Sequence, residues 1–194
     1  MDFIKTLIPE IVLIRPKLIK DKRGYFVETF LLKELESEIG YKLNFCQDNE
    51  TMSKKGVLRG LHFQAPPFAQ SKLVRVIEGE VLDVAVDIRK GSPTFGMHVY
   101  ERLNSTNKHQ LFIPRGFAHG FVVLSEFAIF SYKVDNYYSF EREVGLAFDD
   151  PSLNINWQLS IDQLKLSDKD LKNPRLEMLE DECSNLDYKK NLYE

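Results

Sequence analysis

The sequence predicts a mainly β fold, in which short antiparallel strands form a sandwich or a barrel with a few short helices. Between Lys72 and Val134, apolar residues alternate with polar ones at the two-residue period of strands. Glycine and proline turns separate these segments at short intervals, as is typical of all-β domains. A clear helical period is limited to residues 31–39.

Length and charge restrict the function classes. The 194 residues suit one domain, and we expect a single domain over residues 1–194 with a charged extension from about residue 173. A hydrophobic fraction of 43% is enough for a sizeable core. The net charge of -3 gives no general affinity for nucleic acid or anionic membranes, so any phosphate must be bound by a local group of Arg and Lys.

Several features favour a cytoplasmic location. No apolar run is long enough to span a bilayer. The first residues, MDFIKTLIPEIVLIRPK, lack the early basic segment of a signal peptide. Cys46 and Cys183 lie far apart and match no metal spacing, so free thiols in a reducing compartment are the simpler interpretation.

The first elements along the chain are short. Residues 1–20 mix Ile, Val and Leu with Pro9 and Pro16, which indicates an edge strand and its lead-in. A turn at residues 21–24 leads into an extended segment, residues 25–30.

Residues 31–39 form the expected helix. One face of it carries Leu32, Leu35 and Ile39, and Gly40 is well placed to end it. Residues 44–53 are polar and form a strand or a loop.

The middle of the chain is the most regular part. Residues 72–77 form a strand with Lys72, Val74 and Val76 on one face, and Glu78-Gly79 is typical of a hairpin turn. The next strand, residues 81–89, has an apolar face opposite Asp83 and Asp87; that face carries Leu82, Val84, Val86 and Ile88. Further strands are expected at residues 97–103, 111–113, 121–124 and 127–134.

The end of the chain has a different character. Residues 157–166 show no clear period, and Ser167 can cap a helix start with Asp170 three residues on. From Asn173 the sequence is charged and only weakly periodic, so we expect it to pack loosely.

Residues 57–74, VLRGLHFQAPPFAQSKLV, concentrate the chemistry. They place Arg59, His62, Gln64, Gln70 and Lys72 among apolar residues, and Gly60 and Pro66-Pro67 are expected to break the backbone into short extended pieces. A histidine near fixed positive charges can remove a carbon-bound proton and hold the resulting enolate. A buried, hydrogen-bonded structural histidine is an equal alternative for His62 alone.

The four histidines differ in context. His62 and His119 lie in apolar, turn-rich segments, whereas His98 and His109 lie among polar residues and are expected to be exposed. The segment Pro114-x-Gly116-x-x-His119 resembles the second half-motif of cupin barrels, which often bind a metal. The first half-motif supplies two histidines one residue apart, and here Gln64 takes the second place after His62. Metal binding is therefore the minority interpretation.

Three other residues have a structural and a catalytic interpretation. Lys72 can lie on a solvated sheet face, but a lysine inside a barrel needs a partner or a function. Tyr132 shares a strand face with Ala128 and Phe130 and can be a core residue with one satisfied hydroxyl. Asp170 can be a capping carboxylate.

Long blocks of the chain resemble the dTDP-4-dehydrorhamnose 3,5-epimerase family, cupin-type β-barrel enzymes of nucleotide-sugar metabolism. The resemblance covers residues 21–170 in the family's order and spacing. The blocks are DKRGYFVETF, GVLRGLHFQAPPFAQSKLVRVIEGEVLDVAVDIRKGSPTFG, IPRGFAHGFVVLS, YKVDNYYS and LSDKD. So long a set is far more specific than one short motif.

The resemblance implies a reaction that needs neither a metal nor another cofactor. The substrate would be dTDP-4-keto-6-deoxyglucose, whose C4 ketone acidifies the hydrogens at C3 and C5. By resemblance, His62 is the general base, Asp170 orients and charges it, Lys72 stabilises the enolate, and Tyr132 returns a proton on the opposite face of the sugar. Two groups on opposite faces are the minimum for inversion without ring flipping.

The resemblance also implies substrate contacts and a homodimer. Arg23, Arg59 and Lys169 match residues that contact the diphosphate or sugar oxygens, and Tyr138 matches an aromatic that stacks on thymine. The other matching contacts are Phe26, Glu28, Gln47, Asn49, His119 and Glu143. The turn at residues 21–24 is expected to reach toward a partner subunit. Two departures from the family are the loop AQSKL, with Ser71 before Lys72, and the acidic tail, to which we assign no function.

Three alternatives to the double epimerase remain. The same scaffold serves single-site 3- or 5-epimerases and 3,4-ketoisomerases of related nucleotide deoxysugars. A non-catalytic sugar-nucleotide-binding cupin is less favoured, because a binding module has no use for a lysine opposite a tyrosine. A metal-dependent cupin oxygenase would need stoichiometric metal.

Overall fold

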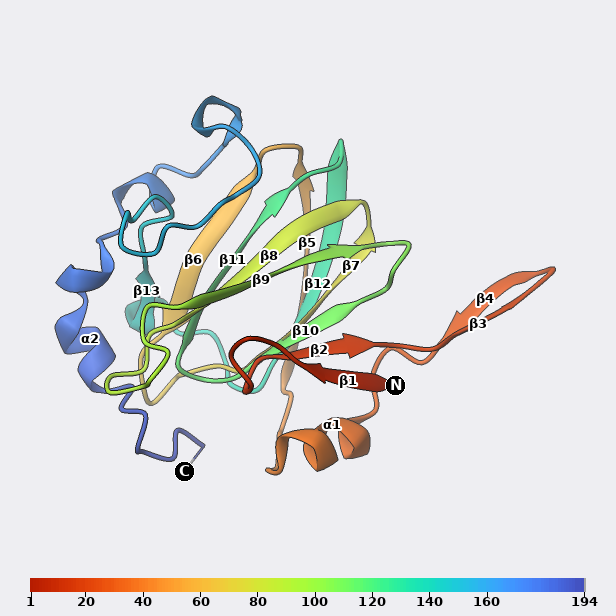
Figure 1. Cartoon of the computed structure of the whole chain (residues 1–194), viewed down its shortest axis with the longest axis horizontal. Helices are drawn as coiled ribbons and strands as arrows, with labels where there is room; N and C mark the ends of the chain where they lie inside the picture. The colour runs from red at the N-terminus through yellow and green to blue at the C-terminus, as the bar shows by residue number, and fades with distance from the viewer. Residues whose placement is uncertain (194) are drawn as a thin grey trace.

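The computed structural model describes residues 1–193, and its strands form two large antiparallel sheets (Figure 1). The six-stranded sheet has the order β1-β2-β10-β7-β12-β5, and the five-stranded sheet has the order β13-β6-β11-β8-β9. The first comprises β1 (Asp2–Lys5), β2 (Val12–Arg15), β5 (Gln47–Lys54), β7 (Lys72–Glu78), β10 (Gln110–Ile113) and β12 (Phe127–Val134). The second comprises β6 (Leu58–Gln64), β8 (Glu80–Asp87), β9 (His98–Asn104), β11 (Phe117–Val123) and β13 (Glu143–Gly145). The predicted β sandwich of cupin-like type is confirmed.

The two sheets enclose an apolar core. Val74, Val76 and Phe130 of the six-stranded sheet belong to one buried cluster with Ala85 and Phe121 of the five-stranded sheet. The face of β7 that carries Lys72, Val74 and Val76 therefore points between the sheets, as its alternation predicted. This face lines the functional cavity described below.

Helix α1 (Leu32–Ile39) covers the outer face of the six-stranded sheet. Leu35 of α1 is buried in a second cluster with Leu73 and Phe112, whose side chains point away from the inter-sheet core. Gly40 ends the helix in the left-handed conformation with φ 82°, which confirms the predicted stop.

The outer face of the five-stranded sheet is covered by the last part of the chain. Leu176, Leu179, Cys183 and Leu186 are at most 8% exposed and pack against the sheet's apolar outer residues. The prediction that residues from 173 onward pack loosely is therefore wrong. Acidic residues between the leucines obscure a buried stripe that includes the short helix α2 (Glu180–Ser184).

The turn at Gly79 was also predicted wrongly. Strands β7 and β8 do not form a hairpin, because they belong to different sheets. Gly79 has φ 81°, and a Cβ there would lie 2.1 Å from the Phe127 carbonyl oxygen. The glycine thus allows a sharp corner between the sheets rather than a two-strand turn.

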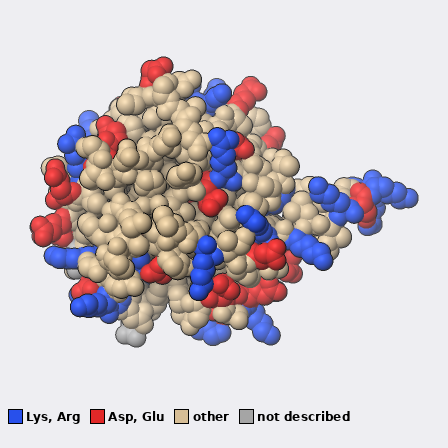
Figure 2. Space-filling view, viewed as in Figure 1, with Lys and Arg blue, Asp and Glu red and all other residues tan. Residues whose placement is uncertain are grey.

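The N-terminal residues form several strands rather than the one edge strand that was predicted. Strand β1 is at the edge as predicted, but β2 lies inside the sheet between β1 and β10. Strands β3 (Leu18–Asp21) and β4 (Gly24–Val27) pair only with each other and project far from the body as a hairpin (Figure 1). Lys and Arg side chains are prominent along this projection (Figure 2).

The rest of the chain contains short 3-10 helices, namely η1 (Phe140–Arg142), η2 (Ile161–Gln163), η3 (Asp170–Lys172) and η4 (Leu176–Met178). Within residues 1–193, no helix is both long and apolar enough to cross a membrane.

Candidate active site

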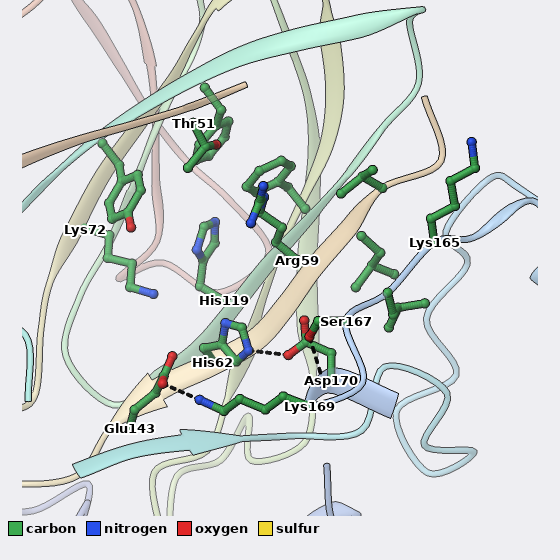
Figure 3. Close-up of a pocket in the computed structure, with 16 residues that line it drawn as sticks. Thr51, Arg59, His62, Lys72, His119, Glu143, Lys165, Ser167, Lys169 and Asp170 are labelled. Atoms are coloured by element: carbon green, nitrogen blue, oxygen red, sulfur yellow. Dashed lines mark hydrogen bonds and ion pairs between the residues drawn. The ribbon is translucent and has the colours of Figure 1, made fainter. Parts of the chain in front are cut away.

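A cavity of about 500 Å³ opens between the two sheets. Both sheets and the segment before η3 contribute to its wall (Figure 3). Its lining includes eight residues predicted from the sequence: Arg59, His62, Lys72, His119, Tyr132, Glu143, Lys169 and Asp170.

Strand β6 carries His62 into the cavity. It is one strand from Leu58 to Gln64, so Gly60 does not divide it into separate pieces as predicted, although the ladder with β11 is irregular at this glycine. Gly60 instead allows β6 to approach β11, since a Cβ at residue 60 would lie 2.6 Å from the Cα of Gly120. The register shift beside Gly120 aligns His62 with His119 across the strands.

His62 is paired with Asp170 at the start of η3. The His62 Nε2 and Asp170 Oδ1 atoms are 2.6 Å apart, and the imidazole is 26% exposed toward the cavity (Figure 3). With Nε2 bound to the carboxylate, Nδ1 is the nitrogen left to accept a proton. The structure confirms the predicted pairing of these two residues.

Asp170 is held as an anion. Burial opposes its ionisation, but the hydrogen bond and charge of His62 together keep the pKa of the carboxyl below its usual value. Its backbone N–H donates to Ser167 Oγ at 3.1 Å, the bond expected of the predicted cap, but the helix is one 3-10 turn whose N-cap position is Lys169 rather than Ser167. A carboxylate bound to one ring nitrogen holds the imidazole in a single orientation.

Lys72 begins β7 and extends into the cavity. Protein atoms surround it, and burial lowers the pKa of its ammonium to about 8, although Asp83 and Glu143 counteract this effect. Cavity water still reaches part of the side chain, which is of intermediate exposure. A partly desolvated cation is suited to stabilise a negative charge that forms beside it.

His119 is buried behind His62, and its partner was not singled out from the sequence. His119 Nε2 lies 2.9 Å from Asp83 Oδ2. Burial lowers the pKa of His119 and raises that of Asp83, and each partner partly offsets the effect on the other. Asp83 could have been identified as an acidic residue within β8, a strand that is buried on both faces.

Tyr132 reaches the cavity from β12, in the sheet opposite His62. Its ring packs against the inter-sheet core, with the Phe130 centroid 6.1 Å away. Burial raises the pKa of the phenol, so it remains protonated at neutral pH and can donate a proton. The predicted strand face is confirmed, and Tyr132 lines the cavity as well as packing against the core.

A small polar cluster lies at the cavity mouth. Glu143 Oε2 accepts hydrogen bonds from the Tyr138 hydroxyl, at 2.9 Å, and from Lys169 Nζ. Burial works against the ionised form, but these two bonds hold the pKa of Glu143 below its usual range. Tyr138 therefore lies beside the cavity rather than in its lining.

Other predicted contacts are less close to the cavity. Gln47 and Asn49 are hydrogen-bonded to each other on β5, and they share a strand face with Thr51, which lines the cavity. Arg23 and Phe26 belong to the projecting hairpin and are mostly exposed, and Glu28 follows it. Within one chain, the hairpin residues do not reach the cavity.

Sequence reasoning also missed polar groups on β5. Thr51 Oγ1 is buried without a hydrogen-bond partner among the described residues, and Ser53 Oγ accepts a hydrogen bond from Arg59 Nε at 3.0 Å. The sequence signal for both residues was the series of uncharged polar residues at every second position from 47 to 53. His98 and His109, expected to be exposed, are partly buried, and burial lowers the pKa of each.

No group of three His, Cys, Asp or Glu side chains in residues 1–193 is arranged to hold a metal ion. Gln64, at the place of a cupin ligand, instead binds backbone: its Nε2 donates to the Phe68 carbonyl at 2.7 Å and its Oε1 accepts from Ser139 N–H.

The fold and the site together define a cupin-like protein with a cavity suited to proton transfer, because a histidine and a phenol line it from opposite sheets. A family model described as dTDP-4-dehydrorhamnose 3,5-epimerase matches residues 5–178. The chain belongs to this family and is an epimerase.

Individual relatives agree with this assignment. The chain is 53% identical to a dTDP-4-dehydrorhamnose 3,5-epimerase of Shigella flexneri over 88% of this chain and 93% of that one. It superposes with a TM-score of 0.92 and 46% identity on a Legionella pneumophila epimerase solved with dTDP-4-keto-L-rhamnose, covering 98% of this chain and 99% of the other. It also resembles a 3'-monoepimerase from Streptomyces bikiniensis solved with dTDP-quinovose, at a TM-score of 0.85 and 30% identity over 91% and 88% of the two chains.

Proposed function

We propose that the protein converts dTDP-4-dehydro-6-deoxy-D-glucose to dTDP-4-dehydro-L-rhamnose by inverting C3 and C5 beside the C4 ketone. The observation that carries this proposal is the placement of His62 and Tyr132 on opposite sheets around one cavity. Inversion requires that a proton leaves one face of the sugar and another arrives on the opposite face. His62 and Tyr132 are suited to this requirement, because they line the cavity from opposite sheets.

His62 acts as the general base in this proposal. Its Nδ1 takes the proton from C3 or C5, while Asp170, 2.6 Å from Nε2, stabilises the imidazolium that results. The electrons of the broken C–H bond form an enolate whose oxygen is the former C4 carbonyl. Lys72 supplies positive charge to that oxygen from within the cavity.

Tyr132 completes the inversion by giving its phenolic proton to the carbanion carbon from the other face. The raised pKa of the buried phenol keeps the proton in place until the enolate forms. The enolate collapses to the ketone, and solvent then reprotonates the tyrosine and deprotonates the histidine.

Residues at the cavity rim are proposed to bind the nucleotide part. Arg59 and Lys169 carry charges suited to diphosphate oxygens, and Tyr138 offers an exposed ring for stacking on the base. Gln47, Asn49, His119 and Glu143 supply further polar contacts, and the unpartnered Thr51 hydroxyl is suited to a sugar oxygen. In the Legionella pneumophila relative, the bound molecule is dTDP-4-keto-L-rhamnose.

The hairpin residues are proposed to act in a homodimer. Arg23, Phe26 and Glu28 match substrate contacts by resemblance but do not line the cavity of their own chain. The hairpin that carries Arg23 and Phe26 projects from the body (Figure 1). The hairpin also exposes Ile19, Tyr25 and Phe26, apolar surface that a second subunit would cover. We propose one domain per subunit and a cytoplasmic location, which the free thiols of Cys46 and Cys183 support.

The deciding experiment is NMR of dTDP-4-keto-6-deoxyglucose with metal-stripped protein in heavy water. We expect deuterium at both C3 and C5, and conversion to dTDP-rhamnose when a ketoreductase is added. Retention of full activity after metal removal supports a mechanism without a metal. Exchange only in the presence of added metal would contradict that mechanism.

A single-site epimerase is the second candidate, because a 3'-monoepimerase shares the fold at 30% identity. It predicts deuterium at one carbon only. Binding without any exchange would instead indicate a sugar-nucleotide-binding protein and would overturn the roles of His62 and Tyr132.

A further inference from the structure

The segment from Leu186 to Tyr193 lies beyond the match to the family model, which ends at residue 178, yet it is tightly attached. Leu186 is fully buried, and the carbonyl of Leu186 and the N–H of Tyr188 both bond to the backbone of Lys90 at 3.0 Å. The Arg89 guanidinium lies 4.9 Å from the centroid of the Tyr188 ring. These contacts hold the segment in place as far as Tyr188.

Tyr193 ends this path in a well-defined polar site. Its ring lies 4.4 Å from the Tyr41 ring and 4.8 Å from the Arg115 guanidinium. Its hydroxyl is 2.8 Å from the Tyr41 hydroxyl and 2.8 Å from Ser71 Oγ, and it accepts from the Arg115 N–H at 3.3 Å. Arg115 Nη1 also donates to the Leu192 carbonyl at 2.7 Å.

Ser71 is the residue that this site holds. It is fully buried, and its N–H donates to Asp135 Oδ1 at 2.6 Å while Tyr193 occupies its hydroxyl. Asp135 is in turn bound by Arg115 Nε at 3.1 Å. Both the N–H and the hydroxyl of Ser71 are therefore held by hydrogen bonds.

The next residue along the chain is Lys72. Neighbouring strand residues point to opposite faces, so Tyr193 packs with Leu73 on the outer face of the six-stranded sheet, whereas Lys72 points into the cavity. Tyr193 therefore cannot touch a substrate in the cavity, but it contacts Ser71, the residue that precedes Lys72.

We propose that Tyr193 is a positioning residue for Lys72, acting through its hydrogen bond to Ser71. This inference rests on the proposed role of Lys72 in holding the enolate. It gives Ser71 and the end of the tail a role in the proposed reaction.

The electrostatic setting of Lys72 provides a readout. The charges of Asp83 and Glu143 act on its ammonium, and the other titratable or charged residues that line the cavity are Arg59, His62, His119, Tyr132, Lys165, Lys169 and Asp170. Within residues 1–193, Tyr193 contacts Tyr41, Ser71, Arg115 and the cluster that includes Leu73, so a change at Tyr193 reaches the ammonium through Ser71 and Leu73, which flank Lys72. If the start of β7 loosens, Lys72 gains water contact and its pKa rises from about 8 toward the ordinary value of 10.5.

The test compares Tyr193→Phe and Ser71→Ala with Tyr188→Phe, a matched loss of one hydroxyl in the same segment. We expect each of the first two variants to lower kcat about five- to tenfold, because both lose the positioning hydrogen bond between Tyr193 and Ser71, with KM changed less than about twofold. The double variant should lose no more than Tyr193→Phe alone, because both changes remove that bond and only Tyr193→Phe also removes the hydroxyl's contacts with Tyr41 and Arg115. Tyr188→Phe should behave as the wild type.

Titration of Lys72 by NMR, with ¹³C label at Cε, tests the inference without substrate. We expect a higher midpoint in Tyr193→Phe and in Ser71→Ala than in Tyr188→Phe. The inference is overturned if Tyr193→Phe matches the wild type in kcat and in Lys72 titration, or if Tyr188→Phe loses as much. Absence of exchange in the wild type would refute the proposed function, and the titration would still decide whether Tyr193 positions Lys72.

Discussion

At the scale of residues, the proposed mechanism divides one chemical step between His62 and Tyr132, which lie on two different sheets. His62 Nε2 has a carboxylate partner 2.6 Å away, whereas Tyr132 packs against apolar neighbours and its burial keeps the phenol neutral. The proposal places the base and the acid on opposite sides of the cavity accordingly. A substrate held between them is exposed to both at once.

Separate substitutions should distinguish these roles. We expect His62→Ala to abolish deuterium exchange at both carbons, a loss of about 100- to 10,000-fold. Tyr132→Phe should reduce formation of inverted product more than it reduces exchange, because abstraction by His62 persists. Both rates are available from the same NMR time course. Wild-type exchange at either carbon in His62→Ala, or equal losses in Tyr132→Phe, would contradict the assignment.

The burial of Lys72 predicts the pH dependence of the reaction. The ammonium is the active form, and its pKa is lowered to about 8, so kcat should fall as pH rises through that value. Lys72→Arg keeps the charge at high pH, so any residual activity of that variant should lack this alkaline decline. The measurement is a kcat profile from pH 6 to about 10. A decline of the same midpoint in Lys72→Arg would assign it to another group.

The same burial should reduce stability. Because the folded pKa is depressed, the penalty for a charged Lys72 is complete below about pH 8 and disappears as pH rises to 10.5, the unfolded value. Cavity water reduces this penalty, so we expect Lys72→Met to be about 1–2 kcal/mol more stable than the wild type at pH 7. Urea denaturation at pH 7 and pH 10 should show that the difference shrinks at the higher pH. A less stable Lys72→Met at pH 7 would contradict this account.

At the scale of elements, the close approach of the neighbouring strands β6 and β11 sets the position of His62. The two strands approach closely at Gly60 and Gly120, two residues before His62 and one after His119. Backbone atoms on both sides leave no room for a side chain. The glycine pair therefore determines how far the imidazole extends into the cavity.

Gly60→Ala should destabilise the protein by roughly 2–5 kcal/mol, since it combines a positive φ with a backbone clash. The matched control is Gly91→Ala, where φ is +78° but nothing lies within 4 Å of the added Cβ. That variant should lose only about 1–2 kcal/mol, from strain alone. Urea denaturation measures both. Equal losses would show that the close approach of β6 and β11 contributes little.

Some element predictions succeeded because their signals are local. The end of α1 at Gly40 and the facing of Lys72 with Val74 depend only on neighbouring residues. The Gly79 corner was predicted wrongly because a glycine with positive φ suits a hairpin and a change of sheet equally well. The packing of residues 176–186 was missed because its partner is a sheet face formed by residues far away in the sequence.

At the scale of the whole molecule, the projecting hairpin is the least self-sufficient part. Its two strands pair with no other strand and expose both basic and apolar side chains (Figure 2). In the proposed homodimer, the hairpin of one subunit would complete the cavity of the other. Exchange of an element between two copies is a common route to symmetric dimers.

Subunit complementation tests this arrangement. Arg23→Ala and His62→Ala should each have low activity alone, since each damages every site of its own dimer. In mixed dimers, one site would contain both changes and the other would contain neither. Co-expression in equal amounts should therefore restore about a quarter of wild-type activity. No recovery, with mixed dimers shown by mass spectrometry, would place Arg23 in the site of its own subunit or outside any site.

The β class, the inward face of β7, the end of α1 and the family blocks could all be read from the sequence, because they depend on short-range alternation, backbone preferences and local residue order. Which distant groups meet depends on the packing of the whole chain. The His62–Asp170 pair joins residues 108 positions apart, and the Tyr193–Ser71 contact joins residues 122 positions apart. The burial that lowers the pKa of Lys72 and of His119 arises from two sheets packed face to face. Such packing sums weak contacts over the whole core, so no local pattern specifies it.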